Sequence, residues 1–231
     1  MNQPENGTAI LLMGGAGTRM GGSCPDKTLV PIVGRPVFSY SLLTIDSSKK
    51  FSEIVIVTRD SVQRGKIEQY VGNLSMHSNV SYVQGGDSRQ KSVLNALLYV
   101  RQKQQNFVLI HDAARPLVTR ENLWQLISAL DGHGGAILAH GATDTLINIS
   151  NRERQYLQRD SVWHVETPQI FGYEAILDAY LKAKGLLTDD SSALPQCAKV
   201  KIVENFHPNI KITHPRDLIV VEALLTKNPA Q

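Results

Sequence analysis

The stretch Ile10–Lys27 reads ILLMGGAGTRMGGSCPDK, so an apolar run is followed by a glycine-rich segment and by two cations, Arg19 and Lys27. A continuous apolar run predicts a buried strand, and glycines after it let the backbone approach a ligand closely. Successive backbone N–H groups before a helix form a site for phosphate oxygens. We therefore predict an anion-binding turn after the first strand, formed by Gly14, Gly15, Ala16 and Gly17.

Similar apolar runs recur along the chain with helical segments between them. After residues 8–13, the predicted strands are Glu53–Thr58, Val80–Gln84, Phe107–His111, Gly135–Ala139 and Lys199–Val203. The predicted helices are Pro36–Ser47, Ser61–Val71, Ser88–Arg101, Arg120–Leu130, Tyr173–Lys184, Asp189–Cys197 and Pro215–Lys227. This alternation predicts an α/β fold with a doubly wound, mainly parallel sheet, whose ligands bind beyond the carboxyl ends of the strands. A length of 231 residues fits one domain, residues 1–231.

The composition argues against several classes of protein. The formal charge is 24 minus 21, or +3, and the basic residues are scattered, which disfavours a nucleic-acid groove. No apolar run approaches the roughly 18 residues of a membrane span, and the polar start MNQPENG lacks a signal-peptide pattern. We therefore expect a cytoplasmic protein. Cys24 and Cys197 lack the spacing of a disulfide framework or a zinc site.

The alternation of strands and helices breaks down between residues 142 and 165. DTLINIS predicts a strand, but the following RERQYLQRD has no clear core face. Because a segment that is not buried on its own domain often contacts a partner, we predict a protruding β-arm that joins two subunits. An exposed hairpin without a partner is the alternative.

The first loop differs from two well-known glycine motifs. A dinucleotide fingerprint requires GxGxxG, yet counting from Gly15 and Gly17 places Met20 at the third glycine position. The chain also lacks the P-loop pattern GxxxxGK[ST]. A plain glycine turn beside a surface Arg and Lys is the remaining alternative, but two cations beside N–H groups repel one another unless an anion binds.

Two further blocks follow predicted strands. In HDAARP, residues 111–116, Asp112 stands at the end of a strand, where a carboxylate can hold Mg²⁺; capping the next helix is the alternative. We expect His111 to pack inside the protein, since Mg²⁺ prefers oxygen ligands. In GGDSRQKS, residues 85–92, two glycines admit a flat base and Asp87 and Ser92 offer hydrogen-bonding groups, although a helix cap explains this block equally well.

The blocks together carry a family resemblance. GGAGTRMGG followed by PDKTLVPIVGRPVFSYS resembles the signature of sugar- and polyol-phosphate nucleotidyltransferases. With HDAARP, GGDSRQKS, TPQIF (167–171), TDDSSAL (188–194) and NIKITHPRDL (209–218), the chain from about Ala9 to Glu222 resembles the 2-C-methyl-D-erythritol 4-phosphate cytidylyltransferase family of the non-mevalonate isoprenoid pathway. The ribitol-5-phosphate cytidylyltransferases are close relatives that share these blocks.

This resemblance implies an enzyme that joins a polyol phosphate to CTP and releases diphosphate, with Mg²⁺ as cofactor and a homodimer as the assembly. The residues implied to stabilise the phosphoryl charge are Arg19, Lys27 and Lys211. Those implied to bind CTP are Gly14, Gly15, Ala16, Gly17, Gly86, Asp87 and Ser92. Those implied to bind the polyol phosphate are Asp112, Arg115, Thr145, Thr188 and, from the other subunit, Arg159; Asp112 also meets the metal.

Two positions depart from the family pattern. The family usually has PKQ where this chain has PDKT, and we assign the cation's role to Lys27 because the acid Asp26 does not replace a cation against a triphosphate. Some members carry a second acid before NIK, where this chain has His207 and Pro208. Metal binding would then rest on Asp112, phosphates and water.

Two other functions remain as alternatives. A ribitol-phosphate or other polyol-phosphate cytidylyltransferase needs the same CTP site, and the hydroxyl contacts that separate the polyols are not readable from one sequence. A non-catalytic nucleotide-binding regulator would keep the base pocket and lose cations. The presence of Arg19, Lys27, Asp112 and Lys211 together argues against a regulator.

Overall fold

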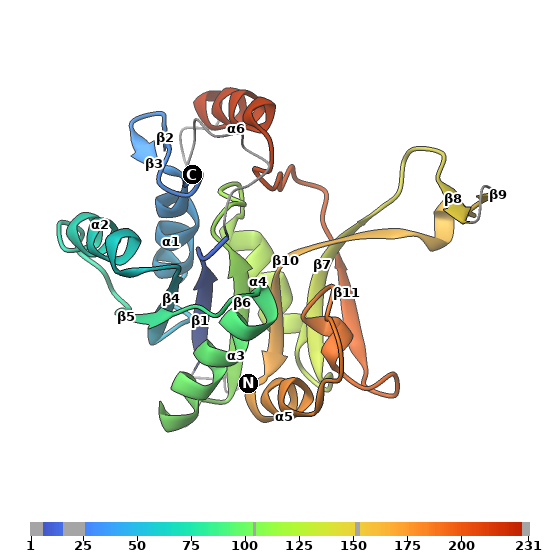
Figure 1. Ribbon diagram of the computed structural model, residues 1–231, viewed down its shortest axis with the longest axis horizontal. Coiled ribbons are helices and arrows are strands. Elements are labelled where there is room, and N and C mark those ends of the chain that lie inside the picture. Colours follow the sequence, from blue (N-terminus) through green and yellow to red (C-terminus); the bar gives the residue numbers. More distant parts are fainter. Residues whose placement is uncertain (1–6, 16–25, 104, 151–152, 228–231) are drawn as a thin grey trace.

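A mixed seven-stranded sheet forms the centre of the molecule (Figure 1). This computed structural model describes residues 7–15, 26–103, 105–150 and 153–227. The sheet has the order β11-β7-β10-β6-β1-β4-β5, and only the two pairs formed by β10 are antiparallel. Its strands are β1 (Gly7–Leu12), β4 (Glu53–Thr58), β5 (Asn79–Gln84), β6 (Phe107–Asp112), β7 (Gly135–Gly141), β10 (Trp163–Gly172) and β11 (Val200–Glu204). The predicted doubly wound, mainly parallel sheet is confirmed.

Helices cover both faces of this sheet. They are α1 (Val37–Ser47), α2 (Ser61–Val71), α3 (Arg89–Val100), α4 (Arg120–Ala129) and α5 (Tyr173–Lys182). A further helix, α6 (Pro215–Lys227), packs against α1 in a separate cluster. One core cluster joins the sheet to α1, α2 and α4, for example through Phe38, Ile67 and Leu126. A second cluster joins the opposite face to α3 and α5, for example through Leu97 and Ile176. None of the described helices is long and apolar enough to cross a membrane.

Three adjacent strands of the sheet owe their position to their sequences. GTAILL in β1, EIVIVT in β4 and FVLIHD in β6 are buried at every position, as expected for strands covered on both faces. β1 lies between β4 and β6, with Leu12 opposite both Val57 and Asp112. The last residue of β6 is therefore an acid at the carboxyl edge of the sheet, directly beside the start of the glycine-rich segment.

Side-chain caps fix where three helices begin. Asp60 accepts a hydrogen bond from the Gln63 N–H at the start of α2, and Ser88 accepts one from Lys91 at the start of α3. Thr119 and Asn122 form a capping box at α4. Asp87 and Asp112 are therefore not helix caps, although the GGDSRQKS block does supply the cap of α3 through Ser88.

Two elements differ from the sequence prediction. TPQIF lies in β10, an antiparallel strand with a register shift between Val165 and Gln169, which the alternating pattern did not reveal. The predicted helix Asp189–Cys197 is wrong, because only a 3₁₀ turn forms at Ser191–Ala193. The Asp189 carboxylate accepts hydrogen bonds from the N–H and hydroxyl of Ser191, a local pairing that competes with helix formation.

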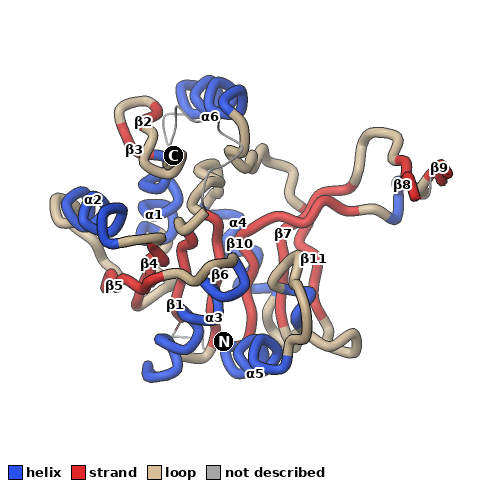
Figure 2. The backbone as a smooth tube through the Cα atoms, in the orientation of Figure 1, coloured by secondary structure: helices blue, strands red, loops and turns tan. Residues whose placement is uncertain are grey.

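The predicted β-arm is present. β7 and β10 run side by side out of the sheet, and the segment between them forms the hairpin of β8 (Ile147–Ser150) and β9 (Glu153–Tyr156), which projects from the body (Figure 2). Both hairpin strands are exposed throughout. Large apolar side chains are among them, with Ile149 69% and Tyr156 66% exposed. The arm thus presents apolar surface to solvent.

Candidate active site

The predicted site residues on β1, β5 and β6 meet at the carboxyl edge of the sheet. Gly14 and Gly15 follow β1, Gly86 follows β5, and Asp112 ends β6. An added Cβ on Gly14 would lie 3.8 Å from the Ser92 Oγ on α3, which places the first turn beside the GGDSRQKS block. Ala16, Gly17 and Arg19 lie outside the described residues.

Tight backbone packing shapes the GGDSRQKS block. A Cβ on Gly86 would lie 2.4 Å from the Lys91 Cβ, so only glycine fits there without a shift. Ser92 is buried, and its Oγ accepts a hydrogen bond from the Gly86 N–H at 3.1 Å and donates one to the Ser88 carbonyl at 2.8 Å. Asp87 instead points to solvent and pairs with Lys91 at 2.7 Å. Ser92 therefore holds the turn, while Asp87 lies at its outer rim.

Asp112 lies between two cations. The Lys211 Nζ donates to its Oδ2 at 2.6 Å, and the Arg89 Nε donates to its Oδ1 at 3.3 Å. Its N–H donates to the buried Thr167 Oγ1 at 3.1 Å. Burial alone would raise the pKa of Asp112, but the charges of Lys211 and Arg89 outweigh burial and hold that pKa well below its usual range. Asp112 is therefore an ionised carboxylate.

Arg89 was not among the predicted site residues. Its two terminal nitrogens donate to the two oxygens of Asp190 at 2.7 and 2.6 Å, and Asp190 is fully buried. Tyr180 also donates to Asp190. Burial alone would lower the pKa of Arg89, but the Asp190 carboxylate raises it above its ordinary value. Arg89 lies in the motif GGDSRQKS and Asp190 in the motif TDDSSAL. Opposite charges in two motifs of one site are the sequence signal that could have indicated this ion pair.

Another buried acid, Glu166, connects the arm to the segment before Lys211. Its Oε1 accepts from the His140 Nδ1 at 2.9 Å, at the root of the arm. Its Oε2 accepts from the Asn205 and Asn209 amides, both at 2.9 Å. The Asn209 carbonyl in turn accepts from the Arg115 Nη1 at 2.7 Å. Glu166, which sequence reasoning missed, thereby fixes the chain that carries Lys211.

Arg115 and His111 lie next to Asp112 in different electrostatic states. Burial lowers the pKa of Arg115, although its ordinary value is so high that the guanidinium stays charged. Burial also lowers the pKa of His111 to about 4, so the imidazole is neutral near pH 7. The Nε2 atom of His111 lies 3.2 Å from the Ser41 Oγ and 3.2 Å from the Arg115 carbonyl. The predicted packing role of His111 is confirmed.

Lys27 reaches the same region from the other end of the chain. Its Nζ donates to the Ile212 carbonyl at 2.6 Å, next to Lys211. The neighbouring Asp26 turns elsewhere, because it accepts from Gln63 Nε2 at 2.6 Å and from the Thr28 N–H at 3.0 Å. The structure thus brings Lys27 and the Lys211 segment together and directs Asp26 toward α2.

Three predicted polyol-site residues are exposed and lie away from Asp112 along the chain. Thr145 stands in the arm, and Thr188 stands just before the two acids Asp189 and Asp190. Arg159 lies in a 3₁₀ turn of the arm, with its Nη1 donating to the Thr143 carbonyl at 3.3 Å. Among the contacts of the described residues, none joins these side chains to Asp112. The contacts of the described residues therefore join Asp112 to Lys211 and Arg89 and to none of these three residues.

The donor set near Asp112 fits a hard cation only in part. No group of three or more metal-ligating side chains gathers among the described residues. One carboxylate supplemented by phosphate oxygens and water is nevertheless a common donor set for Mg²⁺ in nucleotide sites. Asp112 offers such a carboxylate, with both oxygens now paired to cations.

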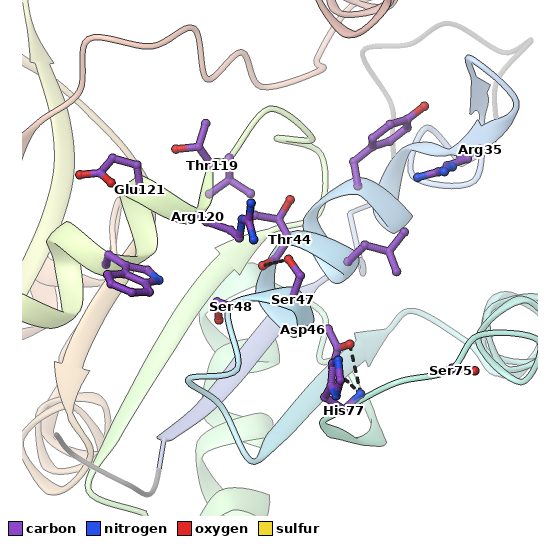
Figure 3. A pocket seen from close by; sticks show the side chains of 14 residues that line it. Arg35, Thr44, Asp46, Ser47, Ser48, Ser75, His77, Thr119, Arg120 and Glu121 are labelled. Carbon is purple, nitrogen blue, oxygen red and sulfur yellow. Dashed lines mark hydrogen bonds between the residues drawn. The ribbon is translucent and has the colours of Figure 1, made fainter. Parts of the chain in front are cut away.

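Two hollows open on the described surface, and only the second includes a predicted site residue. One of about 820 Å³ lies between α1 and α4, where Thr44, Ser47 and Arg120 line it (Figure 3). It shares no lining residue with the Asp112 pair. Another of about 720 Å³ lies at the root of the arm and is lined by Arg115, Glu166 and Asn209. This second hollow adjoins the predicted polyol-phosphate residues.

Comparison with known proteins identifies the family. Residues 8–227 match the family model described as 2-C-methyl-D-erythritol 4-phosphate cytidylyltransferase, IspD. A protein of that name from Geobacillus thermodenitrificans is 36% identical over 98% of this chain and all of the relative. Another from Aquifex aeolicus is 34% identical over 94% of this chain and 97% of its own length.

Solved structures give the same result. The 4-diphosphocytidyl-2C-methyl-D-erythritol synthase of Anaerococcus prevotii superposes with a TM-score of 0.83 at 28% identity, covering 95% of this chain and 98% of that one. The bifunctional IspDF of Campylobacter jejuni gives 0.76 at 26% identity, covering 93% of this chain and 53% of that protein. The order of the motifs, the fold and the full-length matches agree, and the chain belongs to the 2-C-methyl-D-erythritol 4-phosphate cytidylyltransferase family.

Proposed function

We propose that this protein joins 2-C-methyl-D-erythritol 4-phosphate to CTP, forming 4-CDP-2-C-methyl-D-erythritol and diphosphate. The observation that carries the proposal is the Lys211–Asp112 pair, 2.6 Å apart at the carboxyl edge of the sheet and beside the glycine-rich turn. A cation and an ionised acid at that edge suit a reaction between two phosphates. The family supplies the identity of the two substrates.

The proposed reaction is an in-line attack. A phosphate oxygen of the polyol attacks the α-phosphorus of CTP, a new P–O bond forms, and the bond to the leaving diphosphate breaks. Lys27 and Lys211 stabilise the charge on the phosphoryl oxygens, and Arg115 lies close enough to the arm root to help bind the polyol phosphate. Most of the catalysis then comes from orientation and from fixed positive charge.

We further propose Mg²⁺ as the cofactor, with Asp112 as its protein ligand. When bound, Mg²⁺ would neutralise phosphate charge and help orient the triphosphate. Because Lys211 now occupies one Asp112 oxygen, we propose that Lys211 turns to a phosphate when the nucleotide binds. We retain the sequence-based proposal of a cytoplasmic enzyme.

A homodimer completes the proposal. The exposed apolar side chains Ile149 and Tyr156 on the arm would be buried against a second copy. Arg159, 60% exposed on the same arm, would then reach the polyol phosphate bound by the other subunit. The proposed dimer would account for the finding that no described contact joins Arg159 to Asp112 within one chain.

A two-substrate assay tests the proposed function. We expect diphosphate release that requires CTP, Mg²⁺ and 2-C-methyl-D-erythritol 4-phosphate, measured by coupled phosphate detection with the CDP product identified by mass spectrometry. Turnover of ribitol 5-phosphate alone would make the protein a cytidylyltransferase for another polyol. CTP binding without turnover of either polyol would support a regulator instead.

Replacing Arg159 by Ala tests the arm. Loss of a charge-assisted contact to phosphate is expected to raise the KM for the polyol phosphate about tenfold or more, while the KM for CTP is unchanged. Arg101→Ala, at an exposed arginine in the 3₁₀ turn after α3 and outside the arm, is the matched control. An unaltered KM for the polyol phosphate in Arg159→Ala would contradict the proposed role.

A complementation experiment asks whether Arg159 acts across the interface. The Arg159→Ala and Lys211→Gln variants are mixed after mild dissociation and reassembly. A hybrid dimer would contain one site with Lys211 from one chain and Arg159 from the other, so at polyol phosphate concentrations well below the KM of the Arg159→Ala variant its activity should exceed that of either variant alone. Activity equal to the average of the two parents would show that both residues act within one chain.

A further inference from the structure

Four side chains of alternating charge form a line at the edge of the sheet. In order, this charge row is Asp190, Arg89, Asp112 and Lys211. Its members come from four separate parts of the chain, with Arg89 at the start of α3 and Asp112 at the end of β6. Each inner member therefore has a partner of opposite charge on both sides.

The Asp190 end of the row is fixed. Asp190 is fully buried and receives both terminal nitrogens of Arg89, a fork-to-fork geometry that fixes the guanidinium in position as well as in charge. The Tyr180 hydroxyl adds a third donor to the same carboxylate. The neighbouring Asp189 is held separately by Gln169 Nε2 at 2.6 Å. Arg89 therefore has little freedom to leave.

The Lys211 end of the row is looser. Its contact with Asp112 is a single hydrogen bond, and its side chain is 36% exposed. An ammonium on a flexible four-carbon stem changes partners more readily than a guanidinium fixed at two atoms. Asp112 thus shares its two oxygens between one anchored cation and one mobile cation.

We infer that Arg89 is a positioning residue, anchored by Asp190, that keeps the Asp112 carboxylate paired and oriented when Lys211 turns from Asp112 to a substrate phosphate. This inference rests on the proposed function for the destination of Lys211. Its physical basis is independent of that function, because a buried carboxylate that loses its only cation is strongly destabilised. Because Arg89 stays bonded to Asp112 when Lys211 leaves, the buried carboxylate keeps one cation.

A double-mutant cycle on the free protein tests this role without any substrate. Lys211→Gln alone should lower the melting temperature little, since Arg89 still pairs with Asp112. Arg89→Gln with Lys211→Gln should lower it by more than the sum of the two single changes, because neither oxygen of Asp112 then has a cation bonded to it. Repeating the cycle in an Asp112→Asn background should abolish this excess loss. Strictly additive shifts in the wild-type background, or an excess loss that persists in the Asp112→Asn background, would overturn the inference.

Kinetic measurements provide a second readout. Arg89→Gln and Asp190→Asn should each lower kcat about 10- to 100-fold, as expected for partners that orient a site residue, with CTP affinity unchanged in a direct binding assay. Because Asp190 acts through Arg89, Asp190→Asn should add little to Arg89→Gln. Arg64→Gln, which removes an exposed arginine paired with Glu68 on α2, is the matched control and should leave activity unchanged.

Two further variants keep the test decisive. If the doubly substituted protein does not fold, Arg89→Lys with Lys211→Gln retains one charge near Asp112 and should melt between the single and double variants. Tyr180→Phe loosens Asp190 without changing any charge and should lower kcat less than Asp190→Asn.

Absence of turnover in the wild-type protein would reject the proposed function, while the melting-temperature cycle would still test the role of Arg89. Full activity of Arg89→Gln in an active enzyme would reject the positioning role.

Discussion

Lys211→Gln is expected to lower kcat for diphosphate release by about 10²- to 10³-fold, the usual effect of removing one preorganised charge that stabilises a transition state. Lys211 sits 2.6 Å from Asp112 and adjoins Ile212, whose carbonyl binds Lys27. Its loss therefore removes a cation from the place where the phosphates are proposed to meet. Glutamine keeps much of the stem and removes the charge. Steady-state kinetics with both substrates saturating would measure the effect.

Lys201→Gln is the matched control for this prediction. Lys201 is an exposed lysine of the edge strand β11 in the same terminal third of the chain. The Lys201→Gln enzyme should show wild-type kinetics. A fall in kcat in both Lys201→Gln and Lys211→Gln would indicate a general effect of lost positive charge. A Lys211→Gln enzyme with normal kcat would remove Lys211 from the catalytic group.

Asp112→Asn is expected to abolish most activity and also to destabilise the fold. Removing one partner of a buried ion pair costs about 3–5 kcal/mol. Arg89 and Lys211 are 35% and 36% exposed, and solvent screening of these cations lowers our expectation to about 2 kcal/mol of unfolding free energy. Urea denaturation at pH 7 would measure this loss. Asp178→Asn, which removes the acid of an exposed pair with Lys182, is the control and should hardly lower the free energy of unfolding.

The same substitution should change the response to acid. The pKa of Asp112 is lower in the folded protein than its unfolded value of about 4. Its contribution to stability is therefore complete above pH 4 and is lost as the pH falls below 4 toward the folded pKa. The wild-type protein should lose stability more steeply than Asp112→Asn below pH 4. Parallel curves for the two proteins would contradict the ion-pair assignment.

The sequence predicted the central sheet well because its strands are buried on both faces. β1, β4 and β6 are short continuous apolar runs, and such runs are typical of strands buried on both faces. β10 was harder to predict because buried Glu166, Thr167 and Gln169 interrupt its apolar pattern. Those polar groups are satisfied by partners distant in the sequence, which a local pattern does not contain.

The candidate site was predictable where a residue type implies its own chemistry. Asp112 was named because it ends a predicted strand, whereas Lys211 was named only through the family resemblance of its motif, and the structure places the two in contact. Arg89 was not named, because its meaning depends on Asp190, a partner 101 residues away. Asp87 and Ser92 show a further limit. Both were named for their hydrogen-bonding side chains, yet Asp87 faces solvent and Ser92 supports the turn.

The opposite directions of Asp26 and Lys27 have a consequence for chain length. Asp26 is tied to α2 through Gln63, Lys27 is tied to Ile212, and the Met13 N–H is bonded to the Val57 carbonyl. The chain between Gly15 and Asp26 therefore begins and ends at anchored points. Doubling the length of a closed loop costs only about 0.6 kcal/mol of closure entropy. Fold stability thus constrains the length of this segment weakly, and the contact that we propose between its arginine and a triphosphate would be the stronger constraint.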